Sequence, residues 1–159
     1  VPTGRIKDEA AWMLTDDESK RLADFHKNWN RKGKGPVIAC FSHLESDEMF
    51  GCGAGFHHLF IDAIGNVCPC DLTPISLGNL FDEPLLEIWN RMSKWFDLPR
   101  CGCFMGQICD DMAGENTLPV CQKKASQLCD SNRRGEKLPG IFANLFKNRT
   151  PTNPPANRQ

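Results

Sequence analysis

The sequence predicts an α+β fold, in which a small β-hairpin and cysteine-bearing loops pack against several helices. Apolar residues recur at helical intervals in several segments of the chain. Between them, two short runs of β-type residues flank a glycine turn within residues 58–68. Nine cysteines lie mostly in the irregular sequence around these segments, so they direct the functional analysis.

Composition and charge exclude several broad classes of function. The chain has 159 residues, a formal net charge of -1 and 40% hydrophobic residues, which is typical of a soluble globular domain. Without a surplus of positive charge, a general binder of nucleic acid or of anionic membranes is disfavoured. The sequence has neither an apolar run of about 18 residues nor a secretory signal, so a cytoplasmic protein is expected. Because the first residue is not Met, the chain is expected to begin inside a larger protein.

Residues 1–45 are expected to hold one helix and one strand. Thr15 and Glu18 have the spacing of a capping box, which predicts a helix over 16–31 that ends before a glycine-rich breaker. The apolar, β-branched run at 36–41 predicts a buried strand. One face of the helix then needs a partner surface.

Residues 46–131 are expected to form the central unit. The strands of its hairpin are predicted at 58–62 and 66–68, around the glycine turn. A first helix is predicted to start at Pro84, which suits a first-turn position, and to bury one apolar stripe. That stripe consists of Leu85, Ile88, Trp89, Met92, Trp95 and Phe96.

Pro119 is predicted to open a second helix of this unit. Its apolar residues are Val120, Cys121, Ala125, Leu128 and Cys129. Residues 132–159 are expected to add a short helix over 141–146 and a disordered, proline-rich tail.

The cysteines predict the chemistry. In a reducing compartment, clustered thiols more often hold a metal than form disulfides, and an odd number argues against a fully paired disulfide scaffold. A tight hairpin returns the chain on itself, so Cys70 can reach the same ligand sphere as Cys52. Two thiolates from Cys101, Cys103 and Cys109 would complete a four-thiolate cage. Such a cage binds either zinc or a cubane iron–sulfur cluster, and spacing alone leaves both open.

The remaining polar and thiol side chains have plainer interpretations. Cys40, Cys68, Cys121 and Cys129 are expected mainly in the core, with Cys68 as a spare ligand. His57 and His58 are adjacent on a strand and point to opposite sides, so both cannot ligate one metal. His26 and His43 are expected to be solvated or satisfied by a neighbour, and Asp62 and Asp71 to be turn residues.

One set of motifs resembles a known family. Cys52, Gly65 and Cys70 follow the pattern of cysteine, spacer, glycine, four residues and cysteine, and Cys103 and Cys109 have the five-residue spacing that comes later in that pattern. Leu77-Gly78-Asn79-Leu80 and Leu85-Leu86-Glu87-Ile88-Trp89-Asn90 continue the likeness. The segment is similar to the auxiliary-cluster extension, called SPASM or twitch, of radical S-adenosylmethionine enzymes.

The resemblance implies a cofactor and a ligand set. It implies one auxiliary 4Fe-4S cluster held by Cys52 and Cys70 with two of Cys101, Cys103 and Cys109. The departures are a single residue between Cys101 and Cys103, and Ala113 at the place four beyond Cys109. They disfavour two clusters, and Cys121 is the candidate ligand of a second site. The Gly53-Ala54-Gly55 amides are expected to donate hydrogen bonds to the cluster sulfurs.

The resemblance also implies a role and a partner. The cluster would pass electrons or position a peptide-like substrate. Residues 1–45 resemble the end of the partial (β/α) barrel of these enzymes. The Cys-x3-Cys-x2-Cys motif that binds the catalytic cluster is not in this sequence, so no activity is expected of the chain alone, and the expected partner is a radical S-adenosylmethionine barrel in cis or trans. The alternative is a zinc-stabilised module that docks a protein partner.

Overall fold

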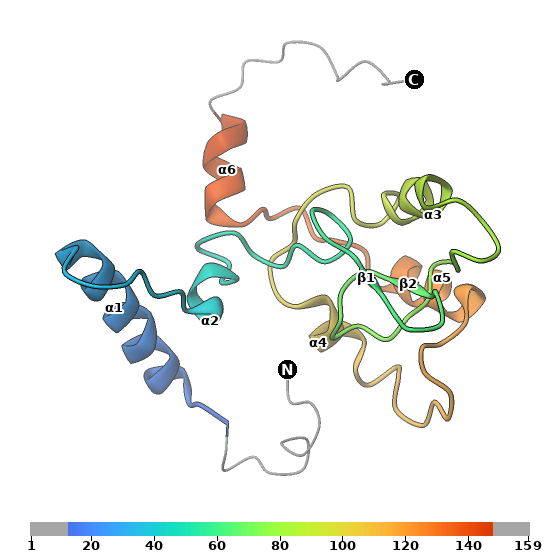
Figure 1. Ribbon diagram of the computed structural model, residues 1–159, viewed down its shortest axis with the longest axis horizontal. Coiled ribbons are helices and arrows are strands. Elements are labelled where there is room, and N and C mark those ends of the chain that lie inside the picture. The colour runs from blue at the N-terminus through green and yellow to red at the C-terminus, as the bar shows by residue number, and fades with distance from the viewer. Residues whose placement is uncertain (1–12, 148–159) are drawn as a thin grey trace.

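The computed structural model describes residues 13–147, and in that range it has six helices and one two-stranded antiparallel sheet (Figure 1). In chain order the elements are α1 Asp16–Lys32, α2 Phe41–Leu44, β1 Phe60–Ile61, β2 Val67–Cys68, α3 Leu85–Met92, α4 Phe104–Ile108, α5 Gln122–Ser131 and α6 Gly140–Lys147. The predicted α+β class is confirmed. Of the helices in the described part, none is both long and apolar enough to cross a membrane.

The first helix, α1, forms where the capping box predicts it. The Thr15 hydroxyl accepts from the Glu18 amide, the Glu18 carboxylate accepts from the Thr15 amide, and Gly33 ends the helix in the left-handed conformation (φ 61°). Figure 1 shows α1 apart from the part of the molecule that holds β1, β2 and α3 to α5. Its buried residue, His26, meets His43 of α2 edge to face, with ring centroids 5.4 Å apart.

The strand predicted over 36–41 is wrong. The backbone there is bonded to a side chain instead of a neighbouring strand: Asn30 accepts from the Ile38 amide at 3.1 Å and donates to the Ile38 carbonyl at 2.8 Å. Val37 is 87% exposed, and Phe41 already belongs to α2. Within residues 13–147 the β-branched run has no partner strand, and Asn30 satisfies the backbone polar groups of Ile38 instead.

The hairpin forms as predicted, with shorter strands. Phe60 pairs with Cys68, and Ile61 pairs with Val67. The Asp62 carboxylate accepts from the backbone amide of Asn66 at 2.9 Å, and Gly65 takes the positive φ (83°) that the turn needs. The turn role predicted for Asp62 is confirmed.

Two helices begin later than their prolines predict. Pro84 is the N-cap of α3 rather than its first residue, and α3 ends at Met92, so Trp95 and Phe96 follow the helix. Pro119 lies three residues before α5, because Val120 first forms a bridge with Ile75. The backbone hydrogen bonds of Val120 go to the 74–76 segment and keep it out of the helix.

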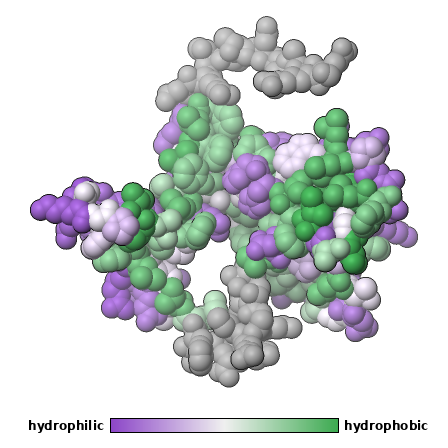
Figure 2. Space-filling view, viewed as in Figure 1, coloured by the Kyte–Doolittle hydropathy of each residue, from purple (hydrophilic) through white to green (hydrophobic). Residues whose placement is uncertain are grey.

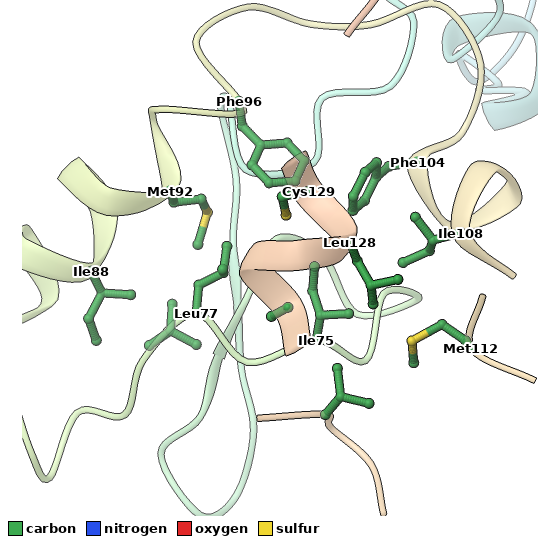
Figure 3. Packing of buried hydrophobic residues seen from close by; sticks show 13 residues of the cluster. Ile75, Leu77, Ile88, Met92, Phe96, Phe104, Ile108, Met112, Leu128 and Cys129 are labelled. Carbon is green, nitrogen blue, oxygen red and sulfur yellow. The ribbon is translucent and has the colours of Figure 1, made fainter. Parts of the chain in front are cut away.

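The core lies between the hairpin, α3, α4 and α5 (Figure 3). Phe96 and Phe104 meet edge to face with ring centroids 5.0 Å apart, and Cys129 of α5 lies beside them. Ile75, Leu77, Ile88, Met92, Ile108 and Leu128 are also buried in this cluster. The last helix, α6, covers residues 140–147, while the predicted tail lies outside the described residues.

Candidate functional site

Cys52 is fixed by its backbone beside the loop that carries the other predicted thiols. Its amide donates to the Arg100 carbonyl at 2.9 Å, and its carbonyl accepts from the Arg100 amide at 3.1 Å. The preceding Gly51 has φ 65°, and a Cβ there would lie 2.2 Å from Cγ of Pro139 and 2.5 Å from the Arg100 oxygen. A glycine is therefore required for this approach.

The Cys52 and Cys103 side chains are hydrogen-bonded to each other. The bond raises the pKa of Cys52, with burial adding to the effect, and it lowers the pKa of Cys103. Backbone amides also point at both sulfurs: those of Phe104 and Ala54 at Cys52, and those of Met105 and Gly106 at Cys103. Cys103 is the N-cap of α4, which brings the first amides of that helix close to its sulfur, although its side chain forms no capping hydrogen bond.

Cys70 reaches the same region along the backbone. The Gly55 amide donates to the Pro69 carbonyl at 2.8 Å, so the hairpin returns the chain beside residues 52–55. The Cys70 side chain is buried, with its sulfur 3.1 Å from the Thr73 hydroxyl. Cys70 and Cys68 share a pocket of about 200 Å³ that Cys52 does not line. That Cys52 and Cys70 form one ligand sphere stays a prediction.

Cys101 and Cys109 flank Cys103 in the sequence. Cys101 is half-buried, and burial raises the pKa of its thiol, with a further contribution from Asp47. Cys109 is exposed at the end of α4, where its sulfur lies 3.4 Å from the Gly106 carbonyl oxygen. Both lie on the same short segment as Cys103.

The other cysteines divide between core and surface. Cys68 and Cys129 are buried as predicted, and burial raises the pKa of these thiols to about 11 and about 12. The core prediction for Cys121 is wrong, because this residue is the N-cap of α5 and its side chain is exposed. Cys40 is half-exposed at the start of α2, with its sulfur 3.1 Å from the Ser42 hydroxyl, so its core prediction is also wrong.

The chemistry of the paired thiols fits a thiolate-ligated cluster. Within residues 13–147, no three His, Cys, Asp or Glu side chains are grouped as a metal site. Of the predicted ligands, the structure brings Cys52 and Cys103 into contact. Those two are surrounded by four backbone amide donors. Amide donors of this kind stabilise the negative charge of cluster sulfurs. Of the expected glycine-loop donors, the Ala54 amide is present.

Arg100 is a feature that the sequence analysis missed. Its side chain is buried, with the residue 2% exposed, and lies over the Phe96 and Phe104 rings at 4.9 and 4.4 Å from their centroids. Burial lowers the pKa of the guanidinium, while the Cys52 thiolate acts in the opposite direction. The available signal was a cation placed directly before Cys101, between the two phenylalanines.

A pocket of about 420 Å³ is lined by both chain neighbours of Cys52. Gly51 and Gly53 line it, together with His57 and His58, whose rings meet at 4.9 Å between centroids. Both histidines are exposed, and burial of the ring lowers the pKa of His57. The remaining lining residues are Phe41, Leu44, Glu45, Phe50, Phe56 and Phe142. Sequence spacing did not predict this pocket, because the distant Phe142 of α6 completes a lining that otherwise comes from residues 41–58.

Comparison with known proteins finds similarity over the segment that carries most of these thiols. Residues 52–113 match the family model of SPASM, the iron-sulfur cluster-binding domain. A 60-residue segment is 32% identical to the AdoMet-dependent heme synthase of Methanosarcina barkeri (strain Fusaro / DSM 804); it covers 38% of this chain and 17% of that protein. No solved structure matches the chain significantly. The segment that holds Cys52, Cys70 and Cys103 is thus similar to the SPASM iron–sulfur cluster-binding domain.

Proposed function

We propose that this chain is an auxiliary 4Fe-4S domain that works with a radical S-adenosylmethionine barrel, in cis or in trans, and has no activity alone. The observation that carries the proposal is the Cys52–Cys103 thiol contact with its four amide donors, inside the segment that matches an iron–sulfur domain. All nine cysteines are free, as ligation requires, which favours a reducing compartment such as the cytoplasm.

The proposed ligands are Cys52, Cys103 and Cys70, with Cys101 or Cys109 as the fourth. Cys70 would exchange its hydrogen bond to Thr73 for a bond to iron. A hydrogen bond contributes about 1 kcal/mol to stability. Thiolate–metal binding contributes about 10 kcal/mol or more in small zinc domains. The gain from a bond to iron therefore exceeds the loss of the Cys70 hydrogen bond to Thr73.

Exposed apolar surface supports a partner domain. Leu14, Leu22 and Phe25 of the α1 region are 54%, 44% and 56% exposed. Figure 2 also has hydrophobic residues over α6 and around α3. Surfaces of this kind mark contacts with another domain or chain. The name of the relative, an AdoMet-dependent enzyme, favours a barrel that uses S-adenosylmethionine as this partner.

The pocket beside Cys52 supports a role in positioning substrate. Its aromatic lining suits an apolar side chain of a peptide-like substrate, and Gly51 and Gly53 would let that group approach the backbone next to the cluster. Electron transfer and positioning are compatible, because both need the cluster close to the bound group.

Anaerobic reconstitution with iron and sulfide tests the proposal. The wild-type chain is expected to bind about four irons per chain, with broad visible absorption that bleaches on reduction. Cys52→Ala, Cys70→Ala and Cys103→Ala are each expected to lose most of the iron. Cys40→Ala is the matched control, because Cys40 lies outside the matched segment and should be dispensable.

Two results would contradict the proposal. One is full iron retention in both Cys52→Ala and Cys70→Ala. The other is a colourless wild-type protein that carries stoichiometric zinc after expression in iron-replete cells and takes up no iron on reconstitution. The second result would instead identify the zinc-stabilised docking module.

A further inference from the structure

A buried cation without an acidic partner, Arg100, is bridged through its backbone to Cys52. Within residues 13–147, Arg100 forms no ion pair, and its Nε has no hydrogen-bond partner. Its other nitrogens donate to neutral oxygens: the Gln107 side chain and the Asn132 carbonyl from Nη1, each at 3.2 Å, and the Trp95 carbonyl from Nη2 at 3.2 Å. These bonds satisfy donors but leave the formal charge uncompensated.

The titratable groups that act on the guanidinium do not supply a counter-ion. They are Asp97, Arg134, Cys52 and Cys129. The Asp97 carboxylate is 61% exposed and lies 3.7 Å from Nε of Arg134. Cys129 is neutral at physiological pH, because burial raises the pKa of its thiol to about 12. The remaining source of negative charge is an anionic group bound at Cys52 and Cys103.

Local geometry connects Arg100 to that site by three routes. Its backbone is bonded to Cys52 in both directions. Its guanidinium lies over the ring of Phe104, whose backbone amide points at the Cys52 sulfur. Its Nη1 donates to Gln107 of α4, the helix that Cys103 caps. The cation is thus held by the same elements that hold the two thiols.

Resting on the proposed function, we propose that Arg100 is the buried counter-ion of the auxiliary cluster and raises its reduction potential. A cubane held by four thiolates is an anion, and it gains one further negative charge when it takes up an electron. A fixed positive charge nearby stabilises the reduced form more than the oxidised form. Burying an unpaired cation destabilises the protein without a cluster, and the negative charge of a bound cluster offsets that cost. Arg100 is therefore a positioning and charge-setting residue rather than a ligand.

A redox titration of the full-length reconstituted chain tests this role. Dithionite supplies the single electron, and electron paramagnetic resonance reports the reduced cluster. Arg100→Met removes the charge and keeps an apolar stem between the rings. It is expected to lower the equilibrium constant for reduction about tenfold or more, a shift of ~59 mV toward negative potential for a one-electron couple. Arg100→Lys keeps the charge and is expected to stay near the wild-type potential.

A matched control separates this effect from a general loss of charge. Arg133→Met removes a cation that is 70% exposed and paired with Asp130. The reduction potential of the cluster in this variant should therefore equal that in the wild type. Thermal unfolding of each variant, with and without iron, adds a second readout. Arg100→Met is expected to reduce the stabilisation that iron adds, whereas a purely structural arginine would lower stability equally in both states.

Each outcome bears on one proposal at a time. A wild-type chain that binds no iron refutes the proposed function. An iron-loaded wild type with Arg100→Met at the same potential refutes the counter-ion role alone. The role is equally refuted if Arg100→Lys behaves like Arg100→Met, including the case in which neither variant folds, because charge is then not what matters.

Discussion

At the residue scale, glycine determines where the proposed ligands lie. Gly51 lets the backbone before Cys52 approach Pro139 and the Arg100 carbonyl, which no residue with a Cβ could do unchanged. The antiparallel bridge between Cys52 and Arg100 depends on that approach. The thiol contact with Cys103 is a consequence of backbone placement as much as of cysteine spacing.

Gly51→Ala is therefore expected to impair iron binding as well as folding. The substitution adds both positive-φ strain and a clash, with the strain alone costing about 1–2 kcal/mol. Gly114→Ala is the control, because Gly114 has φ 89° but a Cβ there would meet nothing within 4 Å. Urea unfolding and iron content measure the two effects. Equal losses of stability and of iron in the two variants would contradict the role given to Gly51.

At the element scale, an ion pair joins α3 to the turn before it. Arg91 donates to the Glu83 carboxylate at 2.7 and 2.5 Å and to the Leu77 carbonyl at 2.7 Å. These hydrogen bonds hold the pKa of Glu83 below its ordinary value of 4.5. The pair thus positions α3, whose Ile88 and Met92 pack in the core beside the hairpin.

The lowered pKa of Glu83 determines how the stability contributed by the Glu83–Arg91 pair changes with pH. A carboxyl whose pKa is lower in the folded than in the unfolded state adds stability above the unfolded value, and this stability is lost as pH falls through the folded value. Glu83→Gln should cost about 1–3 kcal/mol at pH 7. It should also flatten the fall in unfolding free energy below pH 4.5. Glu136→Gln, at an exposed site, is the control. Parallel pH profiles for wild type and Glu83→Gln would rule the pair out as the cause.

At the scale of the whole molecule, the proposed site and α1 lie in different surroundings. The thiol pair borders the core formed by α3, α4 and α5, whereas α1 buries His26 and leaves much of its apolar face exposed. Figure 1 places α1 and α6 outside that central part. Events at the cluster should therefore stabilise the centre without stabilising α1.

Hydrogen exchange of the chain with and without iron measures this difference. Iron binding is expected to slow exchange of the amides of Ala54, Phe104, Met105 and Gly106 about tenfold or more, because they point at the ligand sulfurs and binding stabilises the bound form. The amides of α1 should exchange at unchanged rates. Uniform slowing over both regions would contradict a local site in the centre.

The sequence by itself determined the features that local chemistry encodes. The capping box of α1 and the glycine turn of the hairpin each depend on residues a few positions apart, and both form. Of the apolar stripe predicted for α3, Ile88 and Met92 are buried, whereas Leu85 is exposed. The motif of Cys52, Gly65 and Cys70 likewise identified the segment that matches an iron–sulfur domain. The later starts of α3 and α5 mark the limit of proline as a boundary signal.

Only the tertiary structure decided the features that distant segments share. The run at 36–41 has β-type residues, but no strand of the described part of the chain pairs with it, and the Asn30 side chain bonds the Ile38 backbone. The choice of Cys103 over Cys101 as the partner of Cys52 follows from the Arg100 bridge and from the amides at the start of α4. Arg100 is buried against two aromatic rings, Phe96 and Phe104, which come together only in the folded chain. Sequence spacing records short-range geometry, whereas burial and charge compensation depend on contacts that the chain makes after it has folded.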